Sequence, residues 1–177
     1  MKKMFLGIAM ALVSFGAFAQ THKHEAKLNI LNVILRSSIE LGYEYYLDDN
    51  QSVEGEIMFL DRYSYWPKKD KKFSATSFKV GYNYYLNSSD AVGFYINPFF
   101  KVRVGSLLDY PDEPNEEKTN LGAFIIGVGG GYTWVFNSKF VVAPYINIGR
   151  NFSGPVNERF KKLPVEPNAG IRLGFRF

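Results

Sequence analysis

Hydrophobic and polar residues alternate along most of this chain, and a period of two is typical of β-strands. In the segment 168–177 every second residue is apolar, with asparagine, glycine or arginine between them. The segments 39–45 and 78–84 repeat this alternation, with tyrosines on the apolar face and Glu, Lys, Asn or Gly on the other. The pattern predicts strands with one apolar and one polar face, and no helix-like stretch after the N-terminal targeting segment.

Turn-forming residues divide the pattern into eight expected strands. They lie at about 26–35, 38–47, 53–60, 75–86, 91–105, 120–136, 140–152 and 167–177. The first is the least regular, because Asn29 and Asn32 fall on opposite faces. It contains either a bulge or a segment that is not a strand.

The connections between these strands alternate in length, apart from the first one at 36–37. Three are short and polar, at 48–52, 87–90 and 137–139. The other three are long, charged and proline-bearing, at 61–74, 106–120 and 152–167. Short turns at one end and long loops at the other are typical of outer-membrane barrels. The predicted fold is therefore all-β, an eight-stranded antiparallel up-and-down transmembrane β-barrel.

Even-numbered strands end on a glycine followed by alternating aromatic residues, in GYEYYLDDN, GYNYYLNSS, GYTWVFNSK and the terminal GFRF. These strands all finish at the short-turn end, so their rings fall at one height. A ring of aromatic side chains marks the boundary between lipid and water in membrane barrels. The expected girdle consists of Tyr43, Tyr45, Tyr82, Tyr84, Tyr132, Trp134, Phe175 and Phe177. The neighbouring glycines face the lumen, where a narrow barrel needs small residues.

The N-terminus carries a targeting signal. Two lysines precede an apolar stretch at 4–15 and a small-x-small site at 17–19, which together are typical of a secretory signal peptide. We expect a signal peptide at 1–19, a short leader at 20–25 and the barrel at 26–177. The absence of cysteine excludes disulfides and thiolate metal sites. With 21 basic and 17 acidic residues the charge is too balanced to indicate nucleic-acid binding.

Charged residues on the polar faces should line the lumen. They are Glu40, Glu44, Glu54, Glu56, Lys79, Lys101, Arg103, Arg172 and Arg176. Eight strands enclose little more than side chains, so we expect these groups to pair across the lumen and plug it. Glu40 or Glu44 is predicted to meet Arg172 or Arg176. A narrow path for ions or small solutes is the alternative.

Catalysis and metal binding are not expected. The two histidines, His22 and His24, precede the first expected strand, so no barrel position offers an imidazole as a general base. No catalytic residue, cofactor or metal site is predicted.

The long loops are the expected place for specificity. One loop combines aromatic and basic residues that suit the phosphates of lipopolysaccharide or an acidic partner. These residues are Tyr63, Tyr65, Trp66, Lys68, Lys69, Lys71 and Lys72. The alternative is that they are solvated loop tips that pack against the acidic loop at 106–120.

The chain resembles the small eight-stranded outer-membrane β-barrel proteins of Gram-negative bacteria, of the OmpX, OmpW and OmpA-barrel type. The opening KLNILNVILRSSIELGYEYYL and the aromatic terminus also resemble a short barrel family of Bacteroidota of unassigned function. The resemblance implies an outer-membrane location and contact with outer-membrane lipid. It also implies recognition of the last strand by the barrel assembly machinery, through Leu173, Phe175 and Phe177, and it brings no catalytic residues. The expected function is that of a monomeric structural or surface-interaction protein; a soluble lipocalin-like lipid carrier is a further alternative.

Overall fold

The computed structural model describes residues 23–36, 38–61, 71–86, 90–109, 117–154 and 165–177. The elements follow in chain order as β1 (His24–Asn29), α2 (Ile30–Arg36), β2 (Ile39–Asp48), β3 (Gln51–Phe59), β4 (Lys71–Tyr85), β5 (Gly93–Asp109), β6 (Glu117–Asn120), β7 (Ala123–Phe136), β8 (Phe140–Asn151) and β9 (Val165–Arg176). All strand pairs are antiparallel.

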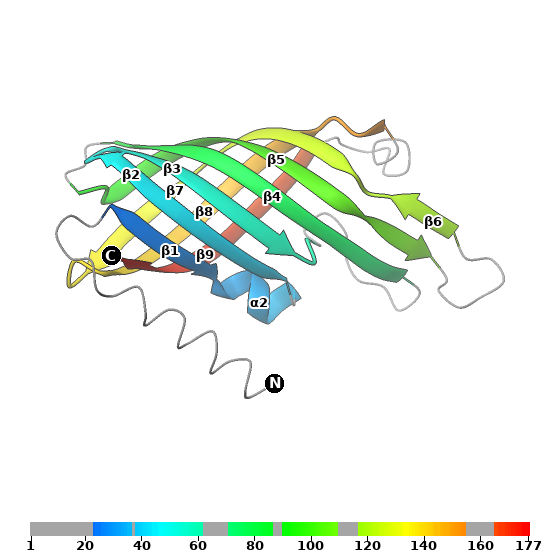
Figure 1. The fold of residues 1–177 in the computed structure, drawn as a ribbon, viewed down its shortest axis with the longest axis horizontal. Coiled ribbons are helices and arrows are strands. Elements are labelled where there is room, and N and C mark those ends of the chain that lie inside the picture. The colour runs from blue at the N-terminus through cyan, green and yellow to red at the C-terminus, as the bar shows by residue number, and fades with distance from the viewer. Residues whose placement is uncertain (1–22, 37, 62–70, 87–89, 110–116, 155–164) are drawn as a thin grey trace.

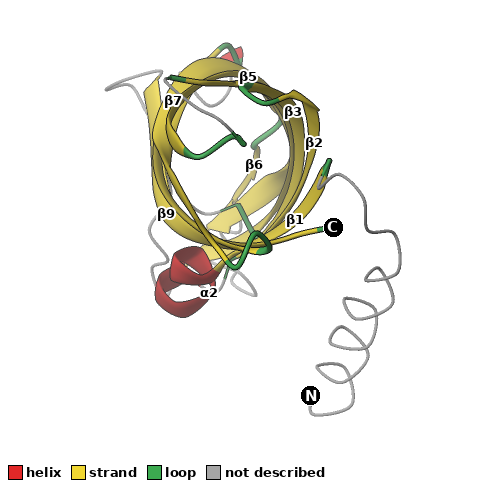
Figure 2. Cartoon of the chain, turned by 90° about the vertical axis from the view of Figure 1, so that its left-hand side faces the viewer, coloured by secondary structure: helices red, strands yellow, loops and turns green. Residues whose placement is uncertain are grey.

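The strands close into a barrel (Figures 1 and 2). Neighbours in sequence pair around the wall, and β1 pairs with β9 to complete the ring. The short β6 pairs with the loop-end part of β5, beyond the stretch where β5 pairs with β7, so β6 and β7 act as one position in the wall. This closed eight-position up-and-down barrel confirms the predicted fold class.

Burial alternates along each strand as the sequence pattern predicts. In β5 the residues Phe94, Ile96 and Phe100 are exposed on the outside, whereas Asn97 and Lys101 are buried in the lumen. Because the outer surface is apolar and the lumen is charged, the hydrophobic side of the sheet points away from the barrel axis. This is the arrangement of a barrel whose outside meets lipid.

The wall is taller on one side than on the other. Strand β3 ends at Phe59, whereas β4 and β5 stay paired as far as Lys71 and Asp109. Figure 1 shows these longer strands projecting beyond β2 and β3 at the end opposite the C-terminus. The expected long loops at 61–74 and 106–120 are therefore partly strand. The prediction failed there because the charged sequences at these strand ends lack the apolar alternation of the rest of the barrel wall.

The first expected strand, 26–35, is wrong beyond Asn29. The Asn29 side chain accepts a hydrogen bond from the backbone nitrogen of Asn32, at 3.2 Å, and so caps the start of α2. The expectation that no helix follows the targeting segment is wrong for the same reason. Helix α2 packs on β9 at the seam of the barrel, and its Ile34 side chain is 75% exposed.

The expected leader at 20–25 also ends earlier than predicted. His24 and Glu25 belong to β1, where they pair with Tyr45 and Glu44 of β2. The backbone groups of His24 also bond those of Phe177, which joins the start of β1 to the last residue of the chain. His24 is thus a barrel residue, contrary to the expectation that both histidines precede the first strand. His22 lies outside the described residues.

Candidate functional site

The lumen is the candidate functional site, because it gathers the buried charges of the described chain. All nine charged residues expected there are buried. Four further charged residues join them: Glu25, Lys27, Asp61 and Glu166. Their contacts divide the lumen into a mouth at the short-turn end and two charged clusters.

The turn-side cluster consists of Lys27, Glu40, Glu44, Glu54, Glu56, Lys79 and Arg172. Lys27 forms ion pairs with Glu44 and, at 2.9 Å, with Glu54. Lys79 lies 3.2 Å from Glu54 and 2.8 Å from Glu56. Lys27 also lies 3.7 Å from Glu25 at the mouth, so each lysine contacts at least two carboxylates, and Glu54 is shared between both lysines.

Arg172 joins three carboxylates of this cluster. Its guanidinium lies 3.5 Å from Glu40 and 3.3 Å from Glu54, and it also pairs with Glu56. It stacks over the ring of Tyr145, 3.8 Å from the ring centroid, and the Tyr145 hydroxyl donates to Glu40 at 2.9 Å. The structure thus contains the Glu40–Arg172 contact that the sequence analysis put forward.

Glu44 is placed differently from its expected arginine pairing. Besides Lys27, it accepts hydrogen bonds from Ser52, from Asn83 at 2.8 Å and from the hydroxyl of Tyr85 at 2.8 Å. It lies at the base of the lumen, where lysine and polar side chains of β1, β3 and β4 surround it. The arginines of β9 take other carboxylates instead.

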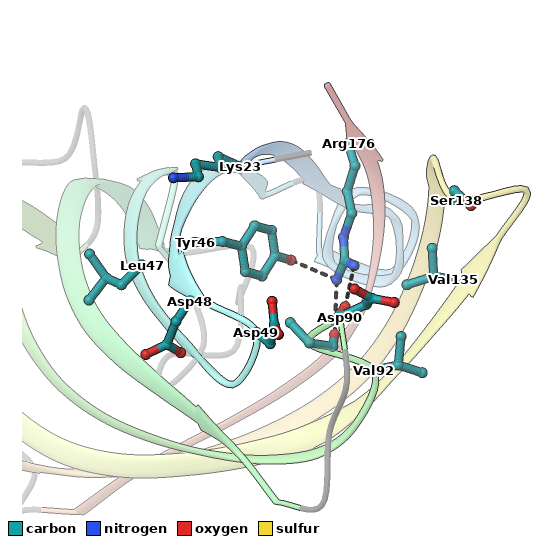
Figure 3. Close-up of a pocket in the computed structure, with 11 residues that line it drawn as sticks. Lys23, Tyr46, Leu47, Asp48, Asp49, Asp90, Val92, Val135, Ser138 and Arg176 are labelled. Atoms are coloured by element: carbon teal, nitrogen blue, oxygen red, sulfur yellow. Dashed lines mark hydrogen bonds between the residues drawn. The ribbon is translucent and has the colours of Figure 1, made fainter. Parts of the chain in front are cut away.

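Arg176 joins β9 to the β4–β5 turn at the short-turn mouth (Figure 3). Its guanidinium bonds Glu25 at 2.8 Å, the hydroxyl of Tyr46 at 2.8 Å, and the backbone carbonyls of Asp90 and Ala91 at 2.7 and 2.9 Å. Ala91 is buried, so the end of the β4–β5 turn folds into the mouth of the barrel. An open cavity of about 520 Å³ remains at this mouth. Its lining includes Arg176 and Asp90.

The loop-side cluster consists of Asp61, Lys101, Arg103 and Glu166. Arg103 donates hydrogen bonds to both carboxylates. Its Nε and Nη2 each lie 3.0 Å from Asp61, and its Nη1 lies 2.8 Å from Glu166. Lys101 lies 2.7 Å from Asp61. Burial raises the pKa of the Asp61 carboxyl, but Lys101 and Arg103 outweigh that effect and hold it below the ordinary 3.8.

An apolar layer lies in the lumen beside Lys79 and Lys101, one cation from each cluster. It is formed by Met58, Phe99 and Ile125, which are all buried. The ring of Phe99 lies over Gly127 of β7 and Gly149 of β8, and a Cβ atom at Gly127 would overlap it. A void lined by this layer together with Lys79, Lys101 and Glu166 measures about 10 Å³, room for about one water molecule.

The expected girdle lies on the outside of the barrel at the short-turn end. Tyr43, Tyr45, Tyr82, Tyr84 and Trp134 are exposed, and Tyr132, Phe175 and Phe177 are half-exposed. The Tyr132 and Trp134 rings lie 4.7 Å apart between centroids. His24 extends the girdle across the seam, because its ring stacks on Phe177 at 5.8 Å and its Nδ1 lies 2.5 Å from the Tyr43 hydroxyl.

Most of the proposed surface-contact residues lie outside the described ranges: Tyr63, Tyr65, Trp66, Lys68 and Lys69. Lys71 and Lys72 belong to β4, not to a loop.

Within the described ranges no group of three or more His, Cys, Asp or Glu side chains could hold a metal ion. In the same part of the chain, no helix has the length and apolar content to cross a membrane.

Comparisons with known proteins agree with this architecture. Residues 5–163 match the family described as "Protein of unknown function (DUF3575)". The chain belongs to this family. No curated protein matches the chain.

The fold is similar to a solved outer-membrane barrel domain. The crystal structure of the N-terminal β-barrel domain of Pseudomonas aeruginosa OprF aligns with a TM-score of 0.50 and 14% sequence identity. The alignment covers 87% of this chain and 95% of that one. At this identity the similarity concerns the fold alone, and it supports a small barrel of the outer-membrane type.

Proposed function

We propose that this chain is a small monomeric outer-membrane barrel with a closed lumen. It acts without catalysis, as a structural or surface-interaction protein, through its long-loop end. The observation that carries this proposal is the crowding of the lumen by side chains. Two ion-paired clusters and buried apolar side chains occupy it, and a void that Lys79, Phe99 and Lys101 line measures about 10 Å³. Because a filled lumen transports little, the surfaces at the two ends and the loops remain for function.

The outer surface supports placement in a membrane. Exposed Phe78, Val80, Phe100 and Val102 form an apolar band on neighbouring β4 and β5, and aromatic rings bound it at the short-turn end. Leu173, Phe175 and Phe177 present the outward apolar pattern that the assembly machinery would recognise. Membrane fractionation and heat-modifiable migration on a denaturing gel distinguish this barrel from a soluble lipid carrier. A carrier would stay in the soluble fraction.

The closed lumen is tested by recording from the purified protein in planar bilayers. We expect no steady conductance steps from the wild-type barrel. Phe99→Ala should produce them, because it removes the ring that spans Gly127 and Gly149. Phe100→Ala is the matched control, since Phe100 is the next residue but points outward. Reproducible steps from the wild type would instead support the alternative function, a narrow channel.

The surface-interaction role is tested at the basic loop. Replacing Lys68, Lys69, Lys71 and Lys72 by alanine should weaken binding of lipopolysaccharide to the folded barrel, because anionic phosphates would lose four cations. A matched variant replaces four acidic residues of the loop at 106–120 by alanine and should keep the binding. Equal binding by the lysine variant and the wild type would remove this part of the proposal.

A further inference from the structure

One outward-facing side chain does not fit a purely apolar membrane surface. Among the described side chains of β1–β5 and β7–β9, Arg150 of β8 carries the one permanent charge on the outer face. It is exposed, between the outward Ile126 of β7 and Val165 of β9. No carboxylate of the described residues forms an ion pair with it. A guanidinium on the outer face, without an ion pair to any described carboxylate, suggests an anionic ligand.

The surroundings of Arg150 combine a cation with a row of aromatic rings. Its guanidinium lies 5.4 Å from the centroid of the Phe152 ring. Phe152, directly after β8, lies 6.4 Å from Phe124 of β7, and Phe124 lies 6.1 Å from Phe100 of β5. The three phenylalanines are exposed. A cation next to an exposed apolar strip is complementary to an anionic lipid, because the guanidinium can face the headgroup while the rings face an acyl chain.

The height of Arg150 on the wall suits a lipid headgroup. Along β8, Arg150 follows Val142 by eight positions, and Val142 pairs with Trp134 of the girdle. At about 3.3 Å per residue and a tilt near 40°, this corresponds to about 20 Å along the barrel axis. An apolar band is about 25 Å tall, so Arg150 lies near its outer boundary. At that height an outward arginine costs far less free energy than at the bilayer midplane. Its guanidinium can reach the polar headgroup layer.

We propose that Arg150 and the row Phe100, Phe124 and Phe152 form a binding site for a phosphorylated glycolipid of the outer leaflet, with lipid A chemistry. The planar guanidinium binds a phosphate group through two parallel hydrogen bonds, and the rings pack against an acyl chain. This inference rests on the proposed outer-membrane location. It assigns lipid binding to the wall, whereas the proposed surface-interaction role assigns it to the basic loop.

The test titrates the folded full-length barrel, in a neutral detergent, with lipid A and with the same lipid lacking its phosphates, and counts bound lipids by native mass spectrometry. We expect wild type to prefer the phosphorylated lipid by about tenfold, as for a charge-assisted hydrogen-bonded pair. Arg150→Gln should lower this preference, leaving only what the basic loop contributes, and Arg150→Lys should lower it less. Lys118→Gln is the matched control, because Lys118 is an exposed cation on β6, outside the aromatic row.

Several outcomes would overturn the inference. Unchanged preference in Arg150→Gln assigns the phosphate to another group, and equal binding of phosphatidylglycerol or inorganic phosphate shows general anion attraction. Heat-modifiable migration verifies that each variant is folded. Phe152→Leu leaves Arg150 in place and should weaken binding of both the phosphorylated and the dephosphorylated lipid. If the wild type fails to insert into bilayers, the proposed location fails, and this site with it. An inserted barrel without phosphate preference contradicts this site alone.

Discussion

The two charged clusters of the lumen differ in how their charges are shared. In the turn-side cluster four carboxylates share Lys27, Lys79 and Arg172, and every cation contacts at least two of them. In the loop-side cluster two carboxylates face two cations, and both cations contact Asp61. The first cluster is thus short of positive charge, whereas the second is balanced. A single lost cation should therefore cost more in the turn-side cluster than in the loop-side cluster.

The largest effect is expected for Arg172→Met. Glu40, Glu54 and Glu56 would lose a shared cation in a buried site, and an uncompensated buried charge costs about 3–5 kcal/mol. The free energy of unfolding, measured by urea titration of the barrel in lipid vesicles, should fall by that amount. Arg172→Lys keeps the charge and should recover part of the loss. A change of less than about 1 kcal/mol in Arg172→Met would show that water already screens this cluster.

A smaller loss is expected for Arg103→Met in the loop-side cluster. Lys101 remains 2.7 Å from Asp61 and 3.7 Å from Glu166, so both carboxylates keep a cation. We expect a decrease of about 3 kcal/mol, the lower end of the range for a broken buried pair. The same urea titration compares it with Arg172→Met. If the loop-side variant proves the less stable of the two, the difference in charge sharing between the clusters does not control stability.

The barrel and the polarity of its faces were predictable because they depend on local alternation. Residues such as Glu40, Lys79 and Arg103 lie within regular strands, so a period of two decides which way they point. Glu25 was missed because the first strand was expected to begin at residue 26. Lys27 lay inside that expected strand and alternates with Ala26 and Leu28, but no inward face was assigned to it because the strand was irregular. Recognising that alternation in HEAKLN would have placed both residues inside.

Other features depend on contacts between distant segments. Phe99 shares the parity of Lys101 and Arg103 in its strand, but its apolar role requires Gly127 and Gly149 on strands that approach it only in the closed barrel. Asp61 lies beyond the end of β3, so no alternation marks it as a lumen residue. Glu166 alternates with Val165 and Pro167, but it was missed because the last strand was expected to begin at residue 167. Helix α2 forms where β1 stops pairing, and apolar residues such as Ile30 and Leu31 suit a strand as well as a helix.

The pH dependence of the free energy of unfolding should reveal the contribution of Asp61 in the loop-side cluster. Because its pKa is lower in the folded barrel than in the unfolded chain, Asp61 stabilises the fold above the ordinary value of 3.8. This contribution, on the order of 2 kcal/mol, is lost as the pH falls below about 4. In urea titrations from pH 7 to pH 2.5, Asp61→Asn should be less stable than wild type at neutral pH and should approach it in acid. A constant difference between the two would contradict this assignment.

The smallest effect is expected for Glu56→Gln, and it tests the charge excess directly. Removing one of four carboxylates leaves three against three cations, and the amide still offers an oxygen to Lys79 and Arg172. The lost attraction is offset by relief of repulsion from Glu54, so the free energy of unfolding should change by less than about 1 kcal/mol. Glu166→Gln is the matched change in the balanced cluster and should cost about 2 kcal/mol, because Arg103 loses a charged partner. Equal losses in both variants would mean that the carboxylates of the turn-side cluster are as fully compensated as those near the loops. The shortage of positive charge would then have no energetic consequence.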